Sequence, residues 1–126
     1  MPKKKPVFTV DSYGRYSRWD KSARALPKIL EFTQTIEAVE GNEFGLVLKV
    51  KSGKGIRLDF TIEHPEIVED GKLLPMFEGE IFVTRNEYSC FVGDCIWLPE
   101  EDKKGAWKIT VFWQKKIIVT KTFKIV

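Results

Sequence analysis

The single histidine, His64, is the first residue to consider for acid–base chemistry, because its side chain titrates near neutral pH. A general base also needs a positioned partner and a substrate within hydrogen-bond reach. His64 follows a β-like segment and precedes Pro65, and the sequence contains no G-x-S-x-G nucleophile elbow. We therefore expect His64 to hold a loop, and we expect no catalytic residue and no enzymatic activity.

Acidic residues could supply paired carboxylates for glycoside hydrolysis, or a calcium loop. They form two groups: Glu63, Glu66, Glu69 and Asp70, and then Glu100, Glu101 and Asp102. Glycosidases need two carboxylates at a fixed separation, one of them with a raised pKa. Both groups lie in polar loops where no apolar neighbour would desolvate a carboxyl, and the calcium-loop spacing D-x-[DN]-x-[DN]-G is absent. We interpret these residues as solvated loop charge and expect no cofactor.

Cys90 and Cys95 are the two cysteines of the chain. Their C-x4-C spacing fits neither a zinc knuckle nor a redox pair, and two thiolates alone cannot close a zinc site. On a straight strand, residues five apart point to opposite faces. We therefore expect two reduced, mostly buried thiols and no metal. The run SGKG at 52–55 is not a P-loop, because a P-loop has the spacing GxxxxGK[ST] before a helix and here a β-like segment follows.

The N-terminal stretch 13–19 combines aromatic and arginine side chains, which can stack on bases or sugars and pair with phosphates. In an extended strand Tyr13, Arg15 and Trp19 share one face, while Tyr16 and Arg18 share the other. The alternative is that one face packs into a core and the other is ordinary surface. A bulge at Gly14 would change which aromatic ring is exposed. The candidate binding residues are Tyr13, Arg15, Tyr16, Arg18 and Trp19.

Charge is distributed unevenly along the chain. Residues 1–28 hold eight basic and two acidic residues, so the other 13 of 21 basic and 16 of 18 acidic residues lie in 29–126. The basic end could steer anions or could serve as a solubilising tail. Lys3, Lys4 and Lys5 precede Pro6 without an apolar run, which predicts no secretory signal and a cytoplasmic location. No apolar run approaches the ~18 residues of a membrane span.

Hydrophobic periodicity predicts strands throughout the chain. In 56–63 the side chains of Ile56, Leu58, Phe60 and Ile62 share one face, as in a half-buried antiparallel strand. We expect one hairpin of 44–51 with 56–63 around 52–55, another of 107–113 with 117–126 around 114–116, and a turn at 93–94. One helical turn is expected over 20–26. The remaining expected strands are 7–19, an interrupted one over 29–39, 80–84, 88–92 and 95–98.

Seven to nine short strands with turn signals every 8–12 residues are the pattern of an all-β, antiparallel β-sandwich. We expect a single sandwich domain over 7–126, preceded by a flexible basic tail over 1–6.

The last third of the chain resembles a known fold family. GAWKITV at 105–111 and KTFKI at 121–125 read as G-x-W-x-I-x-V … K-x-F-x-I, which is similar to the closing hairpin of bacterial immunoglobulin-like and macroglobulin-like domains. With YGRY at 13–16, FG at 44–45 and WLP at 97–99, the chain resembles a small family of stand-alone bacterial domains of unknown function. The resemblance spans roughly residues 7–126 and implies an immunoglobulin-like sandwich, with no catalytic residue to carry over. A widely separated cysteine pair, typical of antibody domains, is absent.

These observations favour a non-enzymatic, cytoplasmic β-sandwich that acts as a binding module. Its expected partner is another protein, or a second copy of the chain if a strand edge is available. The alternative is nucleic-acid or glycan binding through the stretch 13–19. A third class, an enzyme of unknown type, would need a pocket around His64 or the acidic loops.

Overall fold

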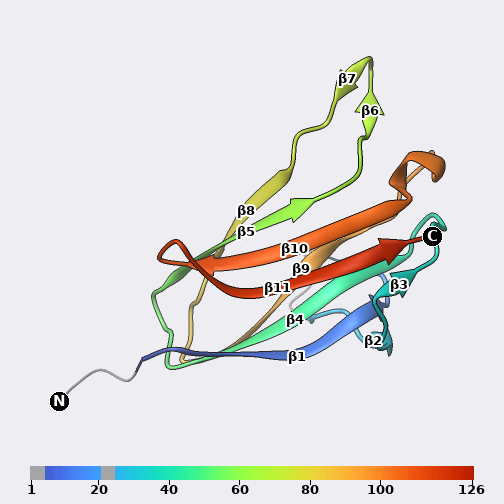
Figure 1. Ribbon diagram of the computed structural model, residues 1–126. Helices are drawn as coiled ribbons and strands as arrows, with labels where there is room; N and C mark the ends of the chain where they lie inside the picture. The colour runs from blue at the N-terminus through green and yellow to red at the C-terminus, as the bar shows by residue number, and fades with distance from the viewer. Residues whose placement is uncertain (1–4, 21–24) are drawn as a thin grey trace.

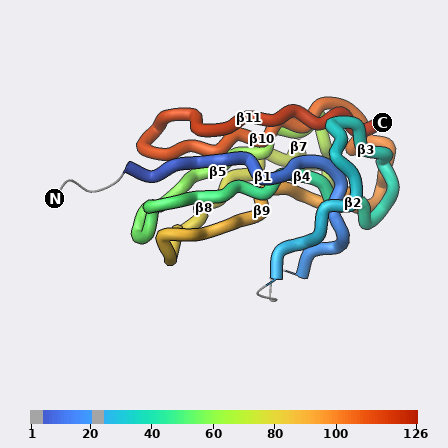
Figure 2. Tube along the Cα trace, turned by 90° about the horizontal axis from the view of Figure 1, so that it is seen from below, coloured from blue at the N-terminus to red at the C-terminus, as the bar shows by residue number. Residues whose placement is uncertain are grey.

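The chain folds into two stacked β-sheets, and the computed structural model describes residues 5–20 and 25–126 (Figure 1). Sheet A has the strand order β2-β1-β4-β9, of which β1, β4 and β9 run side by side in Figure 2, and sheet B has the order β3-β11-β10-β5-β8. Neighbouring strands are antiparallel, except for the parallel pair of β3 and β11. The seven long strands are β1 (Val7–Tyr16), β4 (Glu43–Lys51), β5 (Arg57–Glu63), β8 (Phe77–Phe82), β9 (Glu87–Cys95), β10 (Gly105–Trp113) and β11 (Lys116–Ile125).

Within residues 5–20 and 25–126, four short strands and one short helix complete the fold. They are β2 (Ile29–Glu31), β3 (Thr35–Ile36), β6 (Val68–Glu69), β7 (Lys72–Leu73) and the 3-10 helix η1 (Glu101–Lys103). The strands β6 and β7 form a separate small hairpin, which projects beyond the sandwich in Figure 1. The interrupted strand expected over 29–39 is divided between two sheets, as β2 in sheet A and β3 in sheet B.

The core lies between the two sheets and is formed by the period-two stripes of the sequence. The alternation expected in 56–63 is confirmed, since Leu58 and Ile62 are buried while Arg57 and Glu63 are exposed. The largest buried side chains meet across the layers: the Phe44 ring of sheet A lies 5.3 Å from the Trp107 ring of sheet B. Burying such a side chain stabilises the fold by about 1.5–3 kcal/mol.

The hairpin expected from 44–51 and 56–63 is wrong, because β4 and β5 lie in different sheets. Strand β4 is the centre of sheet A between β1 and β9, whereas β5 pairs with β10 and β8. The loop between them crosses from one layer to the other. A Cβ added at Gly53 would lie 2.7 Å from Val50 Cγ1, so this glycine permits close packing where the loop crosses the end of the core.

The turn expected at 93–94 is also wrong, since β9 continues through both residues to Cys95. Gly93 lies opposite Gly45 in the ladder, and a Cβ at Gly93 would lie 2.0 Å from the Phe44 carbonyl oxygen. The glycine is therefore needed for the close approach of two strands. The separate strand expected over 95–98 is also wrong. Cys95 is the last residue of β9, and the chain leaves the sheet after it.

The closing hairpin is confirmed: β10 pairs with β11 through a two-residue turn at Gln114 and Lys115. Both turn residues have positive φ, as a tight hairpin turn requires. The helical turn expected over 20–26 and the tail expected over 1–6 lie partly outside the described residues. No helix within 5–20 or 25–126 is long and apolar enough to cross a membrane.

Candidate functional site

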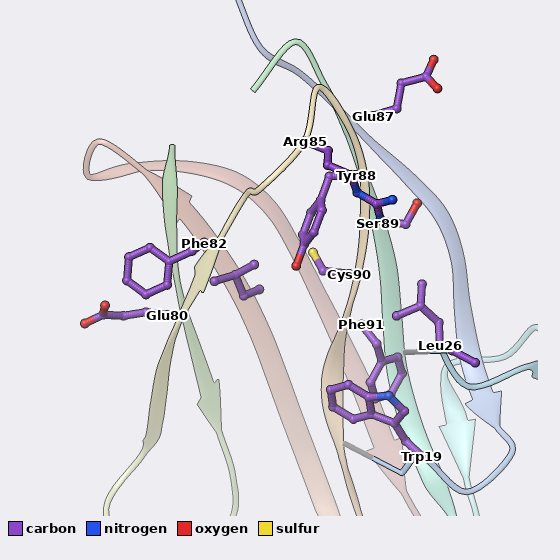
Figure 3. A pocket seen from close by; sticks show the side chains of 12 residues that line it. Trp19, Leu26, Glu80, Phe82, Arg85, Glu87, Tyr88, Ser89, Cys90 and Phe91 are labelled. Carbon is purple, nitrogen blue, oxygen red and sulfur yellow. The ribbon is translucent and has the colours of Figure 1, made fainter. Parts of the chain in front are cut away.

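A pocket of about 630 Å³ runs along one side of the sandwich, where edge strand β9 of sheet A and edge strand β8 of sheet B lie next to each other (Figure 3). Trp19 and Leu26, which follow β1 in the sequence, lie at one end of it. The pocket is lined by Trp19, Ala25, Leu26, Glu80, Ile81, Phe82, Arg85, Glu87, Tyr88, Ser89, Cys90 and Phe91. Its lining therefore combines apolar side chains with three charged ones, Glu80 of β8, Arg85 of the following loop and Glu87 of β9.

One wall of the pocket is an aromatic cluster on the outer face of sheet A. The Phe91 ring lies between two others, 4.9 Å from the Tyr16 ring and 5.1 Å from the Trp19 ring, both edge to face. Tyr16 is buried there, and its hydroxyl is 2.8 Å from the Ser12 hydroxyl. Burial raises the pKa of the Tyr16 phenol, although the bond to Ser12 lowers it. The cluster therefore presents an apolar surface next to the β9 edge.

Backbone hydrogen bonds hold Trp19 in this wall. The Ser17 amide donates to the Lys28 carbonyl (2.8 Å), and the Lys28 amide donates to the Ser17 hydroxyl (2.9 Å), which closes the base of the segment. The Trp19 amide donates to Glu43 Oε1 (3.2 Å) on β4. The side chain of Leu26 packs against the same cluster as Trp19.

The interior of the pocket, between the two sheets, is lined by Ile81, Tyr88 and Cys90. Ile81 and Tyr88 pack against the main core, and Cys90 is buried within it. Desolvation by burial raises the pKa of the Cys90 thiol to about 12, so the thiol is protonated at neutral pH and is a poor nucleophile. Neither Cys90 nor Cys95 forms a disulfide. This part of the pocket can hold an apolar side chain.

The outer edge of β9 offers unpaired backbone groups. Two hydrogen bonds flank the β4–β9 ladder. Just before β9 the Ser52 amide donates to the Asn86 carbonyl, and just after β9 the Ile96 amide donates to the Asn42 carbonyl. The pairing of β4 with β9 between these two bonds has no register shift. Hydrogen-bonded pairs alternate along an antiparallel ladder. The N–H and C=O groups of Glu87, Ser89 and Phe91 therefore point away from β4, and no hydrogen bond between described residues reaches them there.

The five candidate binding residues of the sequence do not form one surface. Tyr16 is buried in the aromatic cluster, and Trp19 is half-buried beside the pocket. Arg15 pairs with Glu31 on β2 (3.6 Å), and Arg18 is exposed. A register shift between Val10 and Ser12 reverses the faces of β1, so its even-numbered residues point inward before the shift and its odd-numbered residues after it. The sequence predicts a bulge at Gly14, but Gly14 lies in register opposite Gly45 and the shift precedes it.

Tyr13 faces the opposite side of the sandwich from the pocket. The Lys121 ammonium of β11 lies 4.1 Å from the centre of the Tyr13 ring, and the exposed Phe32 ring packs edge to face on it at 6.1 Å. Lys121 interrupts the apolar stripe of β11 because it occupies this edge position, where a cation can cover an aromatic face.

His64 holds a loop, as expected. Its Nδ1 lies 2.6 Å from the Pro65 carbonyl oxygen and its Nε2 lies 2.8 Å from the Pro75 carbonyl oxygen. Its ring packs against the Phe77 ring in a tilted arrangement, with 4.6 Å between the ring centres. The imidazole thus ties together the two ends of the loop that carries the β6–β7 hairpin. Among the residues described, no group of three or more His, Cys, Asp or Glu side chains could hold a metal ion.

Sequence reasoning missed the β9 edge. The uncharged run SCFV at 89–92 indicates a strand, but it does not show on which side that strand is paired. Pairing partners are distant in the sequence, so periodicity does not reveal which strand is an edge.

Comparison with known proteins agrees with the fold. The profile of a family described as "Domain of unknown function (DUF3859)" matches residues 4–125. No curated protein matches the sequence. The crystal structure of an immunoglobulin-like protein from Pseudomonas aeruginosa is similar, with a TM-score of 0.74 and 21% identity, over 95% of this chain and 97% of that one. The likeness shows an immunoglobulin-like β-sandwich, and the resemblance found in the sequence is confirmed.

Proposed function

The chain belongs to DUF3859, a domain family of unknown function, and we propose that it is a protein-interaction module that binds an extended segment of a partner protein along the outer edge of β9. In this mode the segment pairs with the edge as an additional strand. Main-chain hydrogen bonds supply affinity, and pockets for alternate side chains supply specificity. The proposed activity is binding, without catalysis.

The observation that carries this proposal is a difference between β9 and the other edge strands. Natural sheets block their edges with bulges, inward-pointing charges, charged side chains or covering strands. In sheet A the opposite edge, β1, has a register shift after Val10 and is partly covered by β2. In sheet B the edge strand β11 carries the inward-pointing Lys121 and is partly covered by β3.

Strand β8, the other edge of sheet B, has six residues against the nine of β9, and it carries exposed Glu78 and Glu80 on its outer face. By contrast, β9 pairs with β4 over nine residues without a register shift. Its central residues 89–92 are uncharged. Among the described edges β9 is therefore the best suited to receive another strand.

The pocket next to β9 provides sites for side chains on both faces of an added strand. On the outer face the added strand would contact Phe91, Trp19 and Leu26. On the inner face it would contact Ile81, Tyr88 and Cys90. An extended segment with apolar residues would bury them on both sides, and each buried aliphatic side chain would contribute about 1.5–3 kcal/mol before the cost of ordering the segment.

The test is a display selection of random twelve-residue peptides against the purified protein, followed by affinity measurement with Ser89→Pro. The Ser89 amide points outward, so proline removes one donor at the edge without breaking a bond to β4, and proline is tolerated at such positions. We expect selected peptides to lose binding at least tenfold with Ser89→Pro, because one main-chain bond is lost and the ring obstructs the edge.

The matched control is Ser89→Ala, which keeps the amide and should bind normally. Circular dichroism and thermal unfolding establish that both variants fold. An independent experiment uses the unmodified protein and a selected peptide that is N-methylated at alternate residues. When the methylated amides are those that point toward β9, the main-chain hydrogen bonds from the peptide to β9 are lost. Recovery of no peptide, or equal affinity for Ser89→Pro and Ser89→Ala together with tolerance of N-methylation, would overturn the proposal.

A further inference from the structure

We infer that the segment bound at β9 carries a carboxylate side chain two residues away from an apolar side chain, with the carboxylate paired to Arg85. This inference rests on the proposed function and specifies the chemistry of its ligand. It follows from the side chains that an added strand would meet on the outer face of sheet A.

The register of sheet A defines the rows of side chains that an added strand would extend. One row runs from Thr9 through Lys49 to Ser89. The next row on the same face runs from Ser12 through Val47 to Phe91. Successive side chains on one face are two residues apart. An added strand would therefore place one residue beside Ser89 and another, two positions away, beside Phe91.

The position beside Phe91 selects an apolar side chain. Phe91 is 5% exposed and belongs to a cluster with Tyr16 and Val47, which are also buried. Trp19 and Leu26 extend this cluster to the pocket. A polar side chain here would lose its hydration without gaining a partner, which is unfavourable.

The position beside Ser89 selects a carboxylate. Arg85 and Ser89 line the same pocket, and the Arg85 side chain extends from the loop before β9 toward Ser89 (Figure 3). Arg85 is exposed, and no carboxylate of the described residues lies within ion-pair distance of its guanidinium. A guanidinium binds a carboxylate with two parallel hydrogen bonds.

Neighbouring charges support this choice. On the same face β4 contributes Lys51, opposite Glu87, and Lys49, which pairs with Asp11 at 3.9 Å. Glu87 thus offsets the charge of Lys51, and Asp11 offsets that of Lys49. Among the described residues of this face, the Arg85 guanidinium is left as the cation that a carboxylate of the ligand can pair with. Glu80 belongs to β8, across the pocket from Ser89 in Figure 3.

The test uses two designed peptides, Ser-Thr-Ile-Val-Glu-Val-Ile-Thr-Ser and the same peptide with lysine in place of glutamate. The central charge has isoleucine two residues away on both sides, so the motif fits β9 in either strand direction. We expect the glutamate peptide to bind about tenfold more tightly at low salt, because attraction is replaced by repulsion at a partly exposed pair. The preference should weaken as salt rises.

Charge reversal of Arg85 separates the proposed pair from general electrostatics. With Arg85→Glu the lysine peptide should bind more tightly than the glutamate peptide. The control is Lys108→Glu, on the exposed face of central strand β10, which makes the same change in net charge and should keep the original preference. Equal binding of both peptides, or an Arg85→Glu variant that still prefers glutamate, would overturn the inference and leave strand addition intact. If neither peptide binds, both proposals fail.

Discussion

At the scale of single residues, burial decides what a chemically capable side chain can do. Cys90 could act as a nucleophile by residue type, but it is 6% exposed and packed in the core. Its Sγ donates a long hydrogen bond, 3.8 Å, to the Leu48 carbonyl oxygen of the neighbouring strand. His64 could act as a base by residue type, but both of its ring nitrogens face proline carbonyl oxygens within its own loop.

The raised pKa of Cys90 predicts how stability depends on pH. The thiol has an ordinary value of 9.0 and a folded value of about 12, so the folded state keeps its proton between these values while the unfolded state loses it. The contribution of this thiol to the free energy of unfolding is fully present below pH 9. It falls by up to ~1.4 kcal/mol per pH unit as the pH rises from 9 toward 12.

Urea unfolding from pH 8 to pH 11 measures this slope, and Cys90→Ala should make it shallower than in the unmodified protein. Iodoacetamide at pH 8 should leave Cys90 unmodified until urea unfolds the chain. Equal slopes with and without the thiol would contradict the assignment.

At the scale of elements, the β6–β7 hairpin depends on contacts from outside itself. A two-stranded hairpin alone is marginally stable in water. This one is joined to the sandwich by buried Ile67, by half-buried Leu74 and by the bond from Trp97 Nε1 to Glu69 Oε1 (2.7 Å). His64 closes its base by facing the Pro75 carbonyl oxygen.

Replacing His64 with alanine should therefore loosen the hairpin without unfolding the sandwich. We expect faster amide exchange at Leu74, whose N–H donates to the Ile67 carbonyl, with a local free-energy loss of about 1–2 kcal/mol. Hydrogen exchange followed by NMR measures this, and the amides of β10 should be unchanged. Lys72→Ala, at the exposed tip, serves as control. Unchanged protection at Leu74 would show that His64 does not hold the loop.

At the scale of the whole molecule, stability depends on contacts between the two sheets. The Phe44 ring of sheet A contacts the rings of Trp107 and Phe123 of sheet B, at 5.3 Å and 5.7 Å between centres. All three side chains are fully buried. The two layers therefore unfold together, because neither sheet can bury its inner face alone.

The variant Phe44→Ala should destabilise the protein by about 3–5 kcal/mol, since it leaves a cavity between the layers. Phe82→Ala is the matched control, because the Phe82 side chain is 61% exposed and its loss should change stability by less than about 1 kcal/mol. Denaturant unfolding followed by tryptophan fluorescence compares them. Similar losses for both variants would contradict a core that lies between the sheets.

The sequence by itself determined the strands whose side chains alternate, the closing hairpin and the two-layer architecture. Local periodicity carries this information, as in Leu58 and Ile62 of β5 and the two turn residues between β10 and β11. Only the tertiary structure decided that β4 and β5 lie in different sheets, that Gly93 serves close strand approach, and that β9 is an edge. These features depend on partners far along the chain, and strand pairing across such separations is set by packing of the whole sandwich. The candidate site belongs to this second group, because Trp19, Phe82 and Ser89 become neighbours of one pocket only after both sheets are assembled.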